Sequence, residues 1–293
     1  MPRRERSLSS LNTSISAARQ VSAGALCACV MLFAVIAGQE WGVIRSAAAA
    51  TSGPPVAFVT GANRGIGLAL STVLADKGWR VIATCRDPEH ADELKALSAK
   101  NPGVTVDRLD VTDNAALDSL AAKYHGQPID VLINNAGILG DADAQQLGRF
   151  DQKTFEDVMR VNAYAPLRVA QTFLDNVAAS RQKKIVTLTS RAGSITVVDQ
   201  AHDNYFYRMS KSASNMSMRL LQNDVRPRGI VVGLISPGPV DTQMNREWRH
   251  GAPPSPSLQS PMQSAAAVVK VIEELTPEQT AHAIDFNGQE LPW

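Results

Sequence analysis

Cysteine is scarce in this sequence. Only three cysteines occur among 293 residues, and two of them, Cys27 and Cys29, lie in an apolar stretch near the N-terminus. Cys85 is the one thiol in the rest of the chain, where no second cysteine is available for an internal disulfide. The cysteines and histidines also lack the spacing of zinc ligands. We therefore expect no metal site and a chain suited to a reducing or redox-indifferent setting.

An excess of charge of either sign is also missing. Lysine and arginine number 29 against 28 aspartates and glutamates, which gives a formal net charge of +1. This balance gives no electrostatic reason to expect nucleic acid as a partner. The length exceeds that of an average domain, but an α/β sheet can absorb about 250 residues as one unit.

Charged residues are absent from 21–38, an apolar stretch of 18 residues that follows a start rich in arginine and serine. A signal peptide would explain the basic start, the apolar centre and the small residues at 46–50. A membrane anchor would explain the length of the stretch. An organelle transit sequence, a disordered segment and a segment ahead of the true start are further alternatives. We set residues 1–53 apart as a leader and assign 54–293 to one domain.

A glycine-rich turn organises this domain. The apolar run 56–59 indicates a buried strand, glycines follow at 61, 65 and 67, and apolar residues then recur at helical spacing. Such a turn presents unpaired backbone N–H groups at the positive end of a helix dipole, where a pyrophosphate can bind. The spacing G-x-x-x-G-x-G differs from the common dinucleotide pattern G-x-G-x-x-G, so the motifs further along must decide whether this is a nucleotide site.

Apolar segments alternate with helical ones along the whole domain. The expected strands are 56–59, 80–84, 104–109, 129–133, 185–189 and 229–235, with a last edge strand within 281–288. Helices are expected at 91–100, 115–124 and 265–275. This alternation predicts a parallel sheet covered by helices on both faces. Ligands of such sheets bind beyond the carboxyl ends of the strands, where the motifs of this sequence fall.

The end of the second expected strand bears on the choice of cofactor. An acid at this point would bind the ribose hydroxyls of NAD, but the strand ends in Thr84 and Cys85, and Arg86 follows. A guanidinium there suits the 2′-phosphate of NADP, and Arg64 in the glycine turn could approach the same phosphate. The alternative is two ordinary surface arginines. We expect NADP(H) to be preferred over NAD(H).

The third expected strand ends at Asp110. Its carboxylate can accept a hydrogen bond from an adenine amino group. Thr112 and Asp113 are candidates for capping the next helix, and both functions can hold at once.

Apolar spacing predicts a helix from Phe155 that continues to Leu174 through Pro166. Proline has no N–H for the carbonyl four residues earlier, here that of Asn162. One helix would therefore be kinked and leave the Asn162 carbonyl free to bind water. The alternative is two helices separated at the proline.

Tyr207 and Lys211 are four residues apart, so on a helix they share one face, whereas Tyr205 has Met209 in that place. A phenol with a pKa near ~10 is a poor proton donor and acceptor at neutral pH. A nearby ammonium such as that of Lys211 stabilises the phenolate and lowers this pKa, as does an oxidised nicotinamide. Such a pair often arises by chance.

Residues 243–262 are rich in proline, serine and small side chains. This composition predicts a long loop after the sixth strand, beside the site, and long loops of this kind are often lids.

Several motifs occur together in this order: Thr60-Gly61-x-x-x-Gly65-x-Gly67, Asn134-Asn135-Ala136-Gly137, Asn162, Ser190, Tyr207-x-x-x-Lys211 and Pro237-Gly238-x-Val240-x-Thr242. Together they resemble the short-chain dehydrogenase/reductase family from about residue 55 to the end. The segments 190–195, 207–211 and 288–293 look like the sniffer-type carbonyl reductase and C-factor subgroup. The resemblance implies an α/β fold with a Rossmann-type doubly wound parallel sheet.

The resemblance also implies roles for individual residues. Tyr207 would be the general acid and Ser190 would hold the carbonyl oxygen. Lys211 would bind the nicotinamide ribose, and Asn162 would hold a relay water. Together with the residues considered above, the expected cofactor contacts are Gly61, Asn63, Arg64, Gly65, Ile66, Gly67, Arg86, Asp110, Val111, Asn134, Ala136, Gly137, Tyr207, Lys211, Pro237, Gly238, Val240 and Thr242.

Two features depart from the family pattern. Ser190 and Tyr207 are 17 positions apart, longer than the commonest family spacing, so we expect an insertion around 199–204 at the substrate mouth. Ser194 is a second candidate for the serine, but Ser190 lies directly at the strand end.

The function implied is hydride transfer between NADP(H) and a carbonyl or secondary alcohol by a homo-oligomer. A dinucleotide-binding signalling or scaffold protein without turnover is the main rival, and an epimerase or dehydratase is a second. NADPH places the domain in the cytoplasm or in an organelle that contains this cofactor, and 21–38 could attach it to a membrane.

Overall fold

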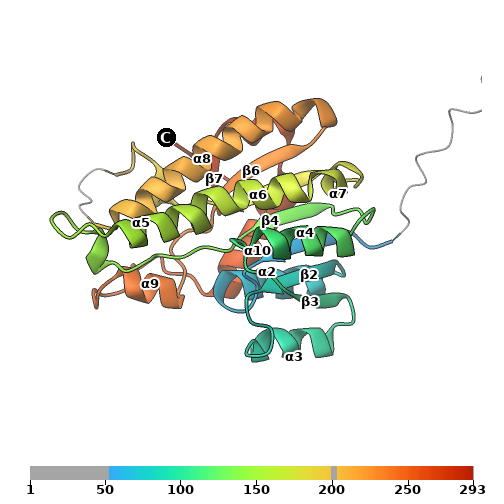
Figure 1. The fold of residues 1–293 in the computed structure, drawn as a ribbon, viewed down its shortest axis with the longest axis horizontal. Coiled ribbons are helices and arrows are strands. Elements are labelled where there is room, and N and C mark those ends of the chain that lie inside the picture. Colours follow the sequence, from blue (N-terminus) through green and yellow to red (C-terminus); the bar gives the residue numbers. More distant parts are fainter. Residues whose placement is uncertain (1–52, 199–202, 293) are drawn as a thin grey trace, which may run out of the picture. The chain divides into compact units, whose positions relative to one another are not determined.

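The computed structural model describes residues 53–198 and 203–292, within which eight strands form one sheet (Figure 1). The strands are β1 (Val56–Thr60), β2 (Arg80–Cys85), β3 (Val104–Arg108), β4 (Val131–Asn134), β5 (Lys184–Leu188), β6 (Val231–Ser236), β7 (Ala283–Asp285) and β8 (Glu290–Leu291). Their order across the sheet is β3-β2-β1-β4-β5-β6-β7-β8. All neighbouring strands are parallel except β7 and β8.

Helices cover both faces of the sheet because the strands alternate their buried side chains between two cores. On one face pack α2 (Gly65–Asp76), α3 (Asp92–Lys100) and α10 (Pro261–Glu274). On the other lie α4 (Asn114–Lys123), α6 (Ala165–Thr172), α7 (Leu174–Ala178) and α8 (Tyr205–Val225). Phe58 and Phe173, both fully buried, join β1 to the second layer with ring centres 4.5 Å apart. The predicted Rossmann-like α/β class is confirmed.

The sheet has its switch point at β1. The chain runs outward from β1 to β2 and β3 on one side and then returns to place β4 on the other side. The carboxyl ends of β1 and β4 therefore lie next to each other, with the glycine turn after one and Asn134–Gly137 after the other. A switch point of this kind opens a crevice for a ligand at that edge.

The expected helix through Pro166 is one continuous helical run. It consists of α5 (Gln152–Met159), a π turn at Arg160–Tyr164, and α6. Within the π turn, the Ala165 N–H bonds to the carbonyl of Arg160, five residues earlier. The wider turn precedes the proline and accommodates it without ending the helix.

Two sequence-based expectations for the C-terminal part are wrong. Residues 243–262 are not one loop, because Gln243–Trp248 forms helix α9, capped by the Thr242 side chain, and α10 begins at Pro261 with a capping box from Ser260 and Gln263. These capping residues start helices in a segment whose composition alone is typical of a loop. The last parallel strand is not the edge of the sheet either, since β8 pairs with β7 on its outer side.

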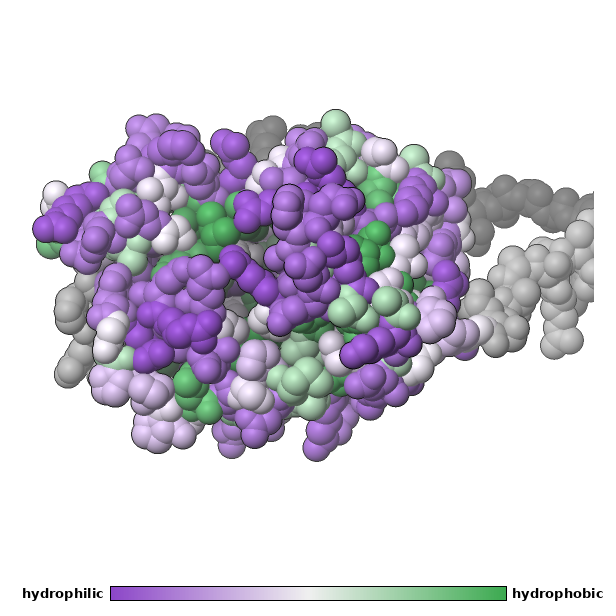
Figure 2. Space-filling view, turned by 90° about the horizontal axis from the view of Figure 1, so that it is seen from below, coloured by the Kyte–Doolittle hydropathy of each residue, from purple (hydrophilic) through white to green (hydrophobic). Residues whose placement is uncertain are grey.

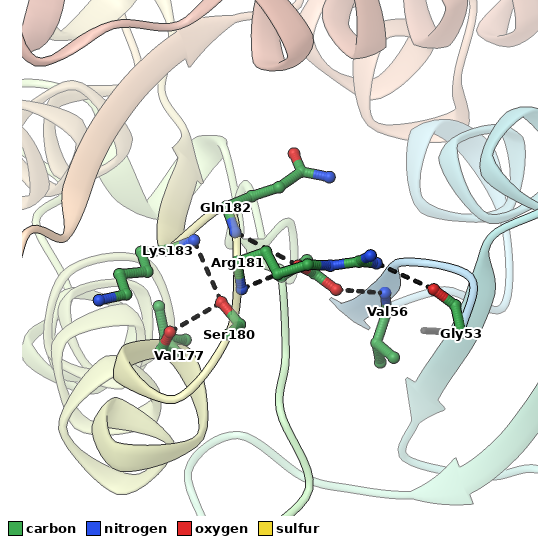
Figure 3. A network of polar contacts seen from close by, with 8 residues as sticks. Gly53, Val56, Val177, Ser180, Arg181, Gln182 and Lys183 are labelled. Atoms are coloured by element: carbon green, nitrogen blue, oxygen red, sulfur yellow. Dashed lines mark hydrogen bonds and ion pairs between the residues drawn. The ribbon is translucent and has the colours of Figure 1, made fainter. Parts of the chain in front are cut away.

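The amino edge of the sheet contains a buried carboxylate. Asp130, just before β4, accepts hydrogen bonds from the Val56 N–H at 2.9 Å and from the Arg181 and Gln182 N–H groups at 3.3 Å each. Figure 3 shows these partners gathered around one point, with the Arg181 guanidinium reaching the Gly53 carbonyl. The start of β1 and the connection before β5 are thus held together by one side chain.

The sequence-based proposals for the leader, and most of the expected insertion at 199–204, lie outside the described residues. Among the helices that the structure describes, none combines the length and hydrophobicity needed to cross a bilayer. Seen from below, the domain presents mainly hydrophilic side chains, with hydrophobic ones showing largely in the hollows between them (Figure 2).

Candidate active site

Helix α8 carries Tyr207 and Lys211 on its buried face, with only 8% and 7% of the two residues exposed. The Lys211 Nζ atom lies 5.7 Å from the centre of the Tyr207 ring. It also donates a 2.8 Å hydrogen bond to the Leu188 carbonyl at the end of β5. The phenol and the ammonium therefore lie side by side at the carboxyl edge of the sheet.

Ser190 stands two residues after the end of β5, close enough to the phenol of Tyr207 to lower its pKa. Its Oγ also accepts a 3.1 Å bond from the Ala192 N–H, at the start of a single 3₁₀ turn, Arg191–Gly193. Ser194, the other candidate, has different partners, because its hydroxyl donates to the Pro292 carbonyl and accepts from the Val197 N–H. Of the two serines, the structure brings Ser190 to Tyr207.

The electrostatics of the pair differ from expectation. Burial raises the pKa of Tyr207 to about 12, against the lowering effects of the Ser190 hydrogen bond and the nearby Arg208 charge. Burial also lowers the pKa of Lys211 to about 8. In the chain by itself the pKa of Tyr207 is thus raised and not lowered, because desolvation of the phenolate dominates.

Asn162 lies in the π turn and is buried. Its Oδ1 accepts from the Ile138 N–H at 2.9 Å, and its Nδ2 donates to the Ile138 carbonyl and to Ser210 Oγ at 2.8 and 3.0 Å. The side chain thus ties the loop after β4 to α8. Its hydrogen bonds are used inside the protein, so only the main-chain carbonyl, which lacks an N–H from Pro166, is left for the expected relay water.

Gln145 was not expected from the sequence. It is fully buried in a short 3₁₀ turn, Asp143–Gln145, and its Oε1 accepts a 2.8 Å bond from the Tyr207 N–H. Its Nε2 donates to the carbonyls of Leu139 and Asp141. Asn204 precedes α8 and makes no side-chain capping bond. Gln145 therefore satisfies a free N–H in the first turn of the helix that carries Tyr207.

The glycine turn leaves no room for side chains. A Cβ at Gly67 would lie 2.2 Å from the Gly61 carbonyl oxygen, and one at Gly61, where φ is +66°, would lie 2.9 Å from Ala136 Cα. Asn135, next to the expected contacts Asn134 and Ala136, donates from Nδ2 to the carbonyls of Thr60 and Gly61. The turn is therefore held against the loop after β4 in one compact shape.

The start of α2 provides hydrogen-bond donors for an anion. The helix begins at Gly65, and Arg64 in the N-cap position gives no side-chain cap. The N–H groups of Gly65, Ile66 and Gly67 therefore have no intrahelical acceptor. Asn63 and Ile66 are half-buried beside them. A pyrophosphate fits this turn, because only backbone donors and a helix dipole meet there.

The arginines expected near the 2′-phosphate take different positions. Arg86 lines a hollow of about 290 Å³ together with Asp110 and Arg108, a residue that sequence reasoning missed. Arg64 instead donates from Nη1 to Gln243 Oε1 of α9 at 2.5 Å. Asp110 Oδ1 accepts from the N–H and hydroxyl of Thr112.

The other residues after β3 mainly contribute to packing and helix capping. Val111 packs on the core under α4. Asp113, not Thr112, caps α4 by accepting from the Ala116 N–H at 3.1 Å. The predicted cap is thus confirmed for the aspartate and wrong for the threonine.

The loop after β4 lies at the centre of the carboxyl edge. Asn134 donates from Nδ2 to the Pro166 carbonyl and to Thr187 Oγ1, and its buried Oδ1 has no partner in the described structure. The Ala136 N–H bonds to Thr60 Oγ1. A Cβ at Gly137 would come within 3.3 Å of Asn162 Oδ1 and 3.9 Å of Lys211 Nζ. The backbone here passes close to the Tyr207–Lys211 pair.

The segment after β6 reaches the glycine turn. Gly238 has φ of +74° and lies against Phe286, the Pro237 carbonyl accepts from Ser264, and Val240 is buried. Thr242 Cγ2 is 3.4 Å from the position of a Cβ on Gly65.

Helix α9 follows and ends over α8. The Trp248 ring meets the Tyr207 ring edge-on, with centres 5.4 Å apart, and the Arg208 guanidinium lies 4.9 Å from the Trp248 ring. Sequence reasoning missed Trp248 because it treated this segment as a loop.

Comparisons with known proteins agree with this arrangement. A family model described as short chain dehydrogenase matches residues 55–253. The C-signal protein of Myxococcus xanthus is 37% identical over 166 residues, which cover 57% of this chain and 93% of that protein.

Solved structures show the same similarity over the domain. A carbonyl reductase from chicken fatty liver, with NADPH bound, is 32% identical with a TM-score of 0.75. The carbonyl reductase Sniffer of D. melanogaster is 26% identical with a TM-score of 0.74. Each comparison covers 82% of this chain and 100% of the other.

Proposed function

We propose that this chain, which belongs to the short-chain dehydrogenase family, transfers a hydride between NADP(H) and a carbonyl or secondary alcohol. The observation that carries the proposal is the contact between Ser190 and Tyr207, beside Lys211, at the sheet edge that also holds the glycine turn. A protein that only binds a dinucleotide has no chemical need for this trio.

Tyr207 donates the proton in the direction of reduction. A pKa of about 12 keeps its phenol protonated at neutral pH, which is the form that can give a proton to a carbonyl oxygen. Ser190 lies beside the phenol and would hold the same carbonyl oxygen in reach of it.

Lys211 and Asn162 support the proton path. Because burial lowers the pKa of Lys211 to about 8, its ammonium can release and regain a proton near neutral pH. Its bond to the Leu188 carbonyl uses one of three N–H donors, which leaves donors for a ribose hydroxyl. The Asn162 carbonyl, which lacks a donor from Pro166, would hold the relay water.

The residues present fit a dinucleotide. Gly61, Gly65 and Gly67 would hold the pyrophosphate with backbone N–H groups, Val240 and Thr242 the carboxamide end, and Asp110, Val111 and the 134–137 loop the adenosine. When bound, the cofactor supplies or accepts the hydride. Arg86 beside Arg108 favours NADP over NAD, and the carbonyl reductase from chicken fatty liver holds NADPH.

We also propose that the domain 54–293 associates with copies of itself. Met209, Met216 and Leu220 of α8 are about half exposed, at spacings that place them on one side of the helix. They neighbour a groove of about 680 Å³ whose lining includes Tyr164 and Leu167. A second copy would bury these apolar side chains, and light scattering of the purified domain would report its mass.

Residues 1–53 remain a separate leader in this proposal. The need for NADPH places the domain in the cytoplasm or in an organelle that contains the cofactor, attached to a membrane if 21–38 is an anchor. Sequencing the N-terminus of the native protein and fractionating cells would decide among these alternatives.

The test is NADPH oxidation by the purified domain with a panel of carbonyl compounds. We expect turnover with reactive carbonyls and, in Tyr207→Phe, a kcat about 10³-fold lower with nearly unchanged NADPH binding. Tyr205→Phe, a surface tyrosine two residues away, is the matched control and should keep full activity. Tight NADPH binding without turnover over the whole panel would instead favour a binding protein, and full activity of Tyr207→Phe would refute the mechanism.

A further inference from the structure

The turn that carries Ser190 cannot fix its own orientation. It is a single 3₁₀ turn, Arg191–Gly193, and Ser190 stands at its start with an extended backbone. Short 3₁₀ segments have poor hydrogen-bond geometry and little stability of their own. The direction of the Ser190 hydroxyl therefore depends on what holds the turn from outside.

Helix α8 holds the turn from one side. The Ser212 hydroxyl donates a 2.9 Å bond to the Gly193 carbonyl, and a Cβ on Gly193 would lie 2.8 Å from Lys211 Cβ. This packing sets the separation between the turn and the helix of Tyr207.

The C-terminal hairpin, β7 with β8 and the residues up to Pro292, holds the turn from the other side. The Arg191 guanidinium forms an ion pair with Asp285 at the end of β7. Beyond the turn, the Ser194 hydroxyl donates to the Pro292 carbonyl. Two bonds, one on each flank, thus connect the turn to a segment that lies nearly a hundred residues later in the chain.

The ion pair is unequal in its surroundings. The Asp285 side chain is 1% exposed, whereas that of Arg191 is 54% exposed. Oδ2 of Asp285 bonds to Arg191, and the other oxygen has no hydrogen-bond partner in the described structure. A buried carboxylate is costly without a counter-ion. Asp285 therefore holds the Arg191 guanidinium in place, and with it the backbone next to Ser190.

We propose that Arg191 and Asp285 are positioning residues that keep the Ser190 hydroxyl directed at Tyr207. The proposal rests on the proposed function, since Ser190 is the group through which the pair acts. It also gives the C-terminal hairpin a part in the active site, although none of its residues is expected to touch the substrate.

The experiment separates positioning from stability with a compensated double variant of the purified chain. Arg191→Met removes the cation and leaves a buried carboxylate unpaired. The double variant R191M/D285N also removes that carboxylate charge. Arg228→Met is the matched control, because Arg228 pairs with the exposed Asp175 on the surface. Melting temperature, NADPH affinity and kcat for carbonyl reduction are measured for each protein.

We expect Arg191→Met to lower the melting temperature by about 5 °C and kcat by about 10-fold to 100-fold, with NADPH affinity unchanged. R191M/D285N should regain the melting temperature but not kcat, and Arg228→Met should change neither. In a Ser190→Ala background, Arg191→Met should cause no further loss of kcat, since the residue acts through Ser190. Recovery of kcat together with stability, or an equal further loss without Ser190, would overturn the proposal.

A crystal structure of R191M/D285N provides a readout that does not depend on turnover. The proposal predicts that the Ser190 hydroxyl moves away from the Tyr207 phenol while the fold is kept, and an unchanged position of Ser190 would refute it. If the unaltered chain has no turnover, the proposed function fails, and this structural result still decides the positioning role.

Discussion

The two edges of the parallel sheet both bury charged side chains, but they use them differently. At the amino edge, Asp130 accepts from three backbone N–H groups, and Lys184 donates to the carbonyls of Ile272 and Glu273 at the end of α10. At the carboxyl edge, Lys211 has one carbonyl partner, and Asn134 and Asp285 each bury an oxygen that has no partner in the described structure. The first edge commits its polar groups to folding, whereas at the second edge Lys211 keeps N–H donors for a ligand and Asp285 holds Arg191 beside Ser190.

The largest expected effect on stability comes from the amino edge. Asp130→Ala leaves the buried N–H of Val56 and the partly buried N–H groups of Arg181 and Gln182 without their acceptor, so we expect the free energy of unfolding to fall by about 3 kcal/mol. The kcat of the folded protein should not change, because the site lies at the other edge. Urea unfolding and kcat measurements would check this, with the exposed Asp175→Ala as the control. If the fully folded variant lost much of its kcat, the two edges would not have separate functions.

We expect the fold to lose stability by burying the Lys211 ammonium at the carboxyl edge. Because its pKa is about 8 in the folded chain, below the usual 10.5, the unfolded chain binds more protons between these values. The free energy of unfolding of the unaltered chain should therefore rise with pH in this window, by on the order of 2 kcal/mol from pH 8 to pH 10 relative to Lys211→Met.

Urea unfolding at the two pH values measures this difference. We compare stabilities only up to pH 10. Above this pH the raised pKa of Tyr207, about 12, makes the free energy of unfolding fall with pH, which opposes the effect of Lys211. The surface variant Lys270→Met should follow the unaltered chain. An identical pH response of Lys211→Met would show that burial does not perturb this lysine.

Gln145 links the two edges' functions, because its side chain stabilises the fold and also holds the helix turn that carries Tyr207. Gln145→Leu leaves the Tyr207 N–H and the Leu139 carbonyl without their partner, so we expect a loss of about 2 kcal/mol in stability and about tenfold in kcat. The neighbouring Gln146→Leu, which loses only a contact with the exposed Asp143, should cost little of either. Loss of stability with unchanged kcat would assign Gln145 to folding alone.

The smallest expected effect concerns the cofactor. Arg86→Ala should raise the Kd for NADPH about tenfold and leave that for NADH unchanged, because one charge-assisted bond to a phosphate is lost. Arg80→Ala, at the other end of the same strand, is the matched control. Fluorescence titration of both cofactors measures the ratio, and an equal change for NADPH and NADH would argue against a 2′-phosphate contact.

Local signals predicted the fold well. The apolar runs located the seven parallel strands, and the glycine spacing located a turn in which the distances from Gly61 and Gly67 leave no room for a Cβ. The four-residue spacing of Tyr207 and Lys211 predicted their shared face, because helix geometry alone decides it.

Contacts between distant segments were beyond such signals. Gln145 meets the Tyr207 N–H across 62 positions, and Arg191 meets Asp285 across 94, so no local pattern connects them. The raised pKa of Tyr207 depends on burial in the folded chain, which composition does not reveal. Helix α9 is different, since Thr242 as its cap was a signal available in the sequence.

The central claim is that the carboxyl edge moves a hydride to a carbonyl carbon with Tyr207 as the proton donor. NADPH that carries deuterium at both C4 positions of the nicotinamide, incubated with the purified domain and a reactive aldehyde or ketone, tests it most directly through the mass of the product. We predict an alcohol that contains the deuterium and is formed about 10³-fold more slowly by Tyr207→Phe. An alcohol without deuterium, or equal rates for the two proteins, would contradict the account.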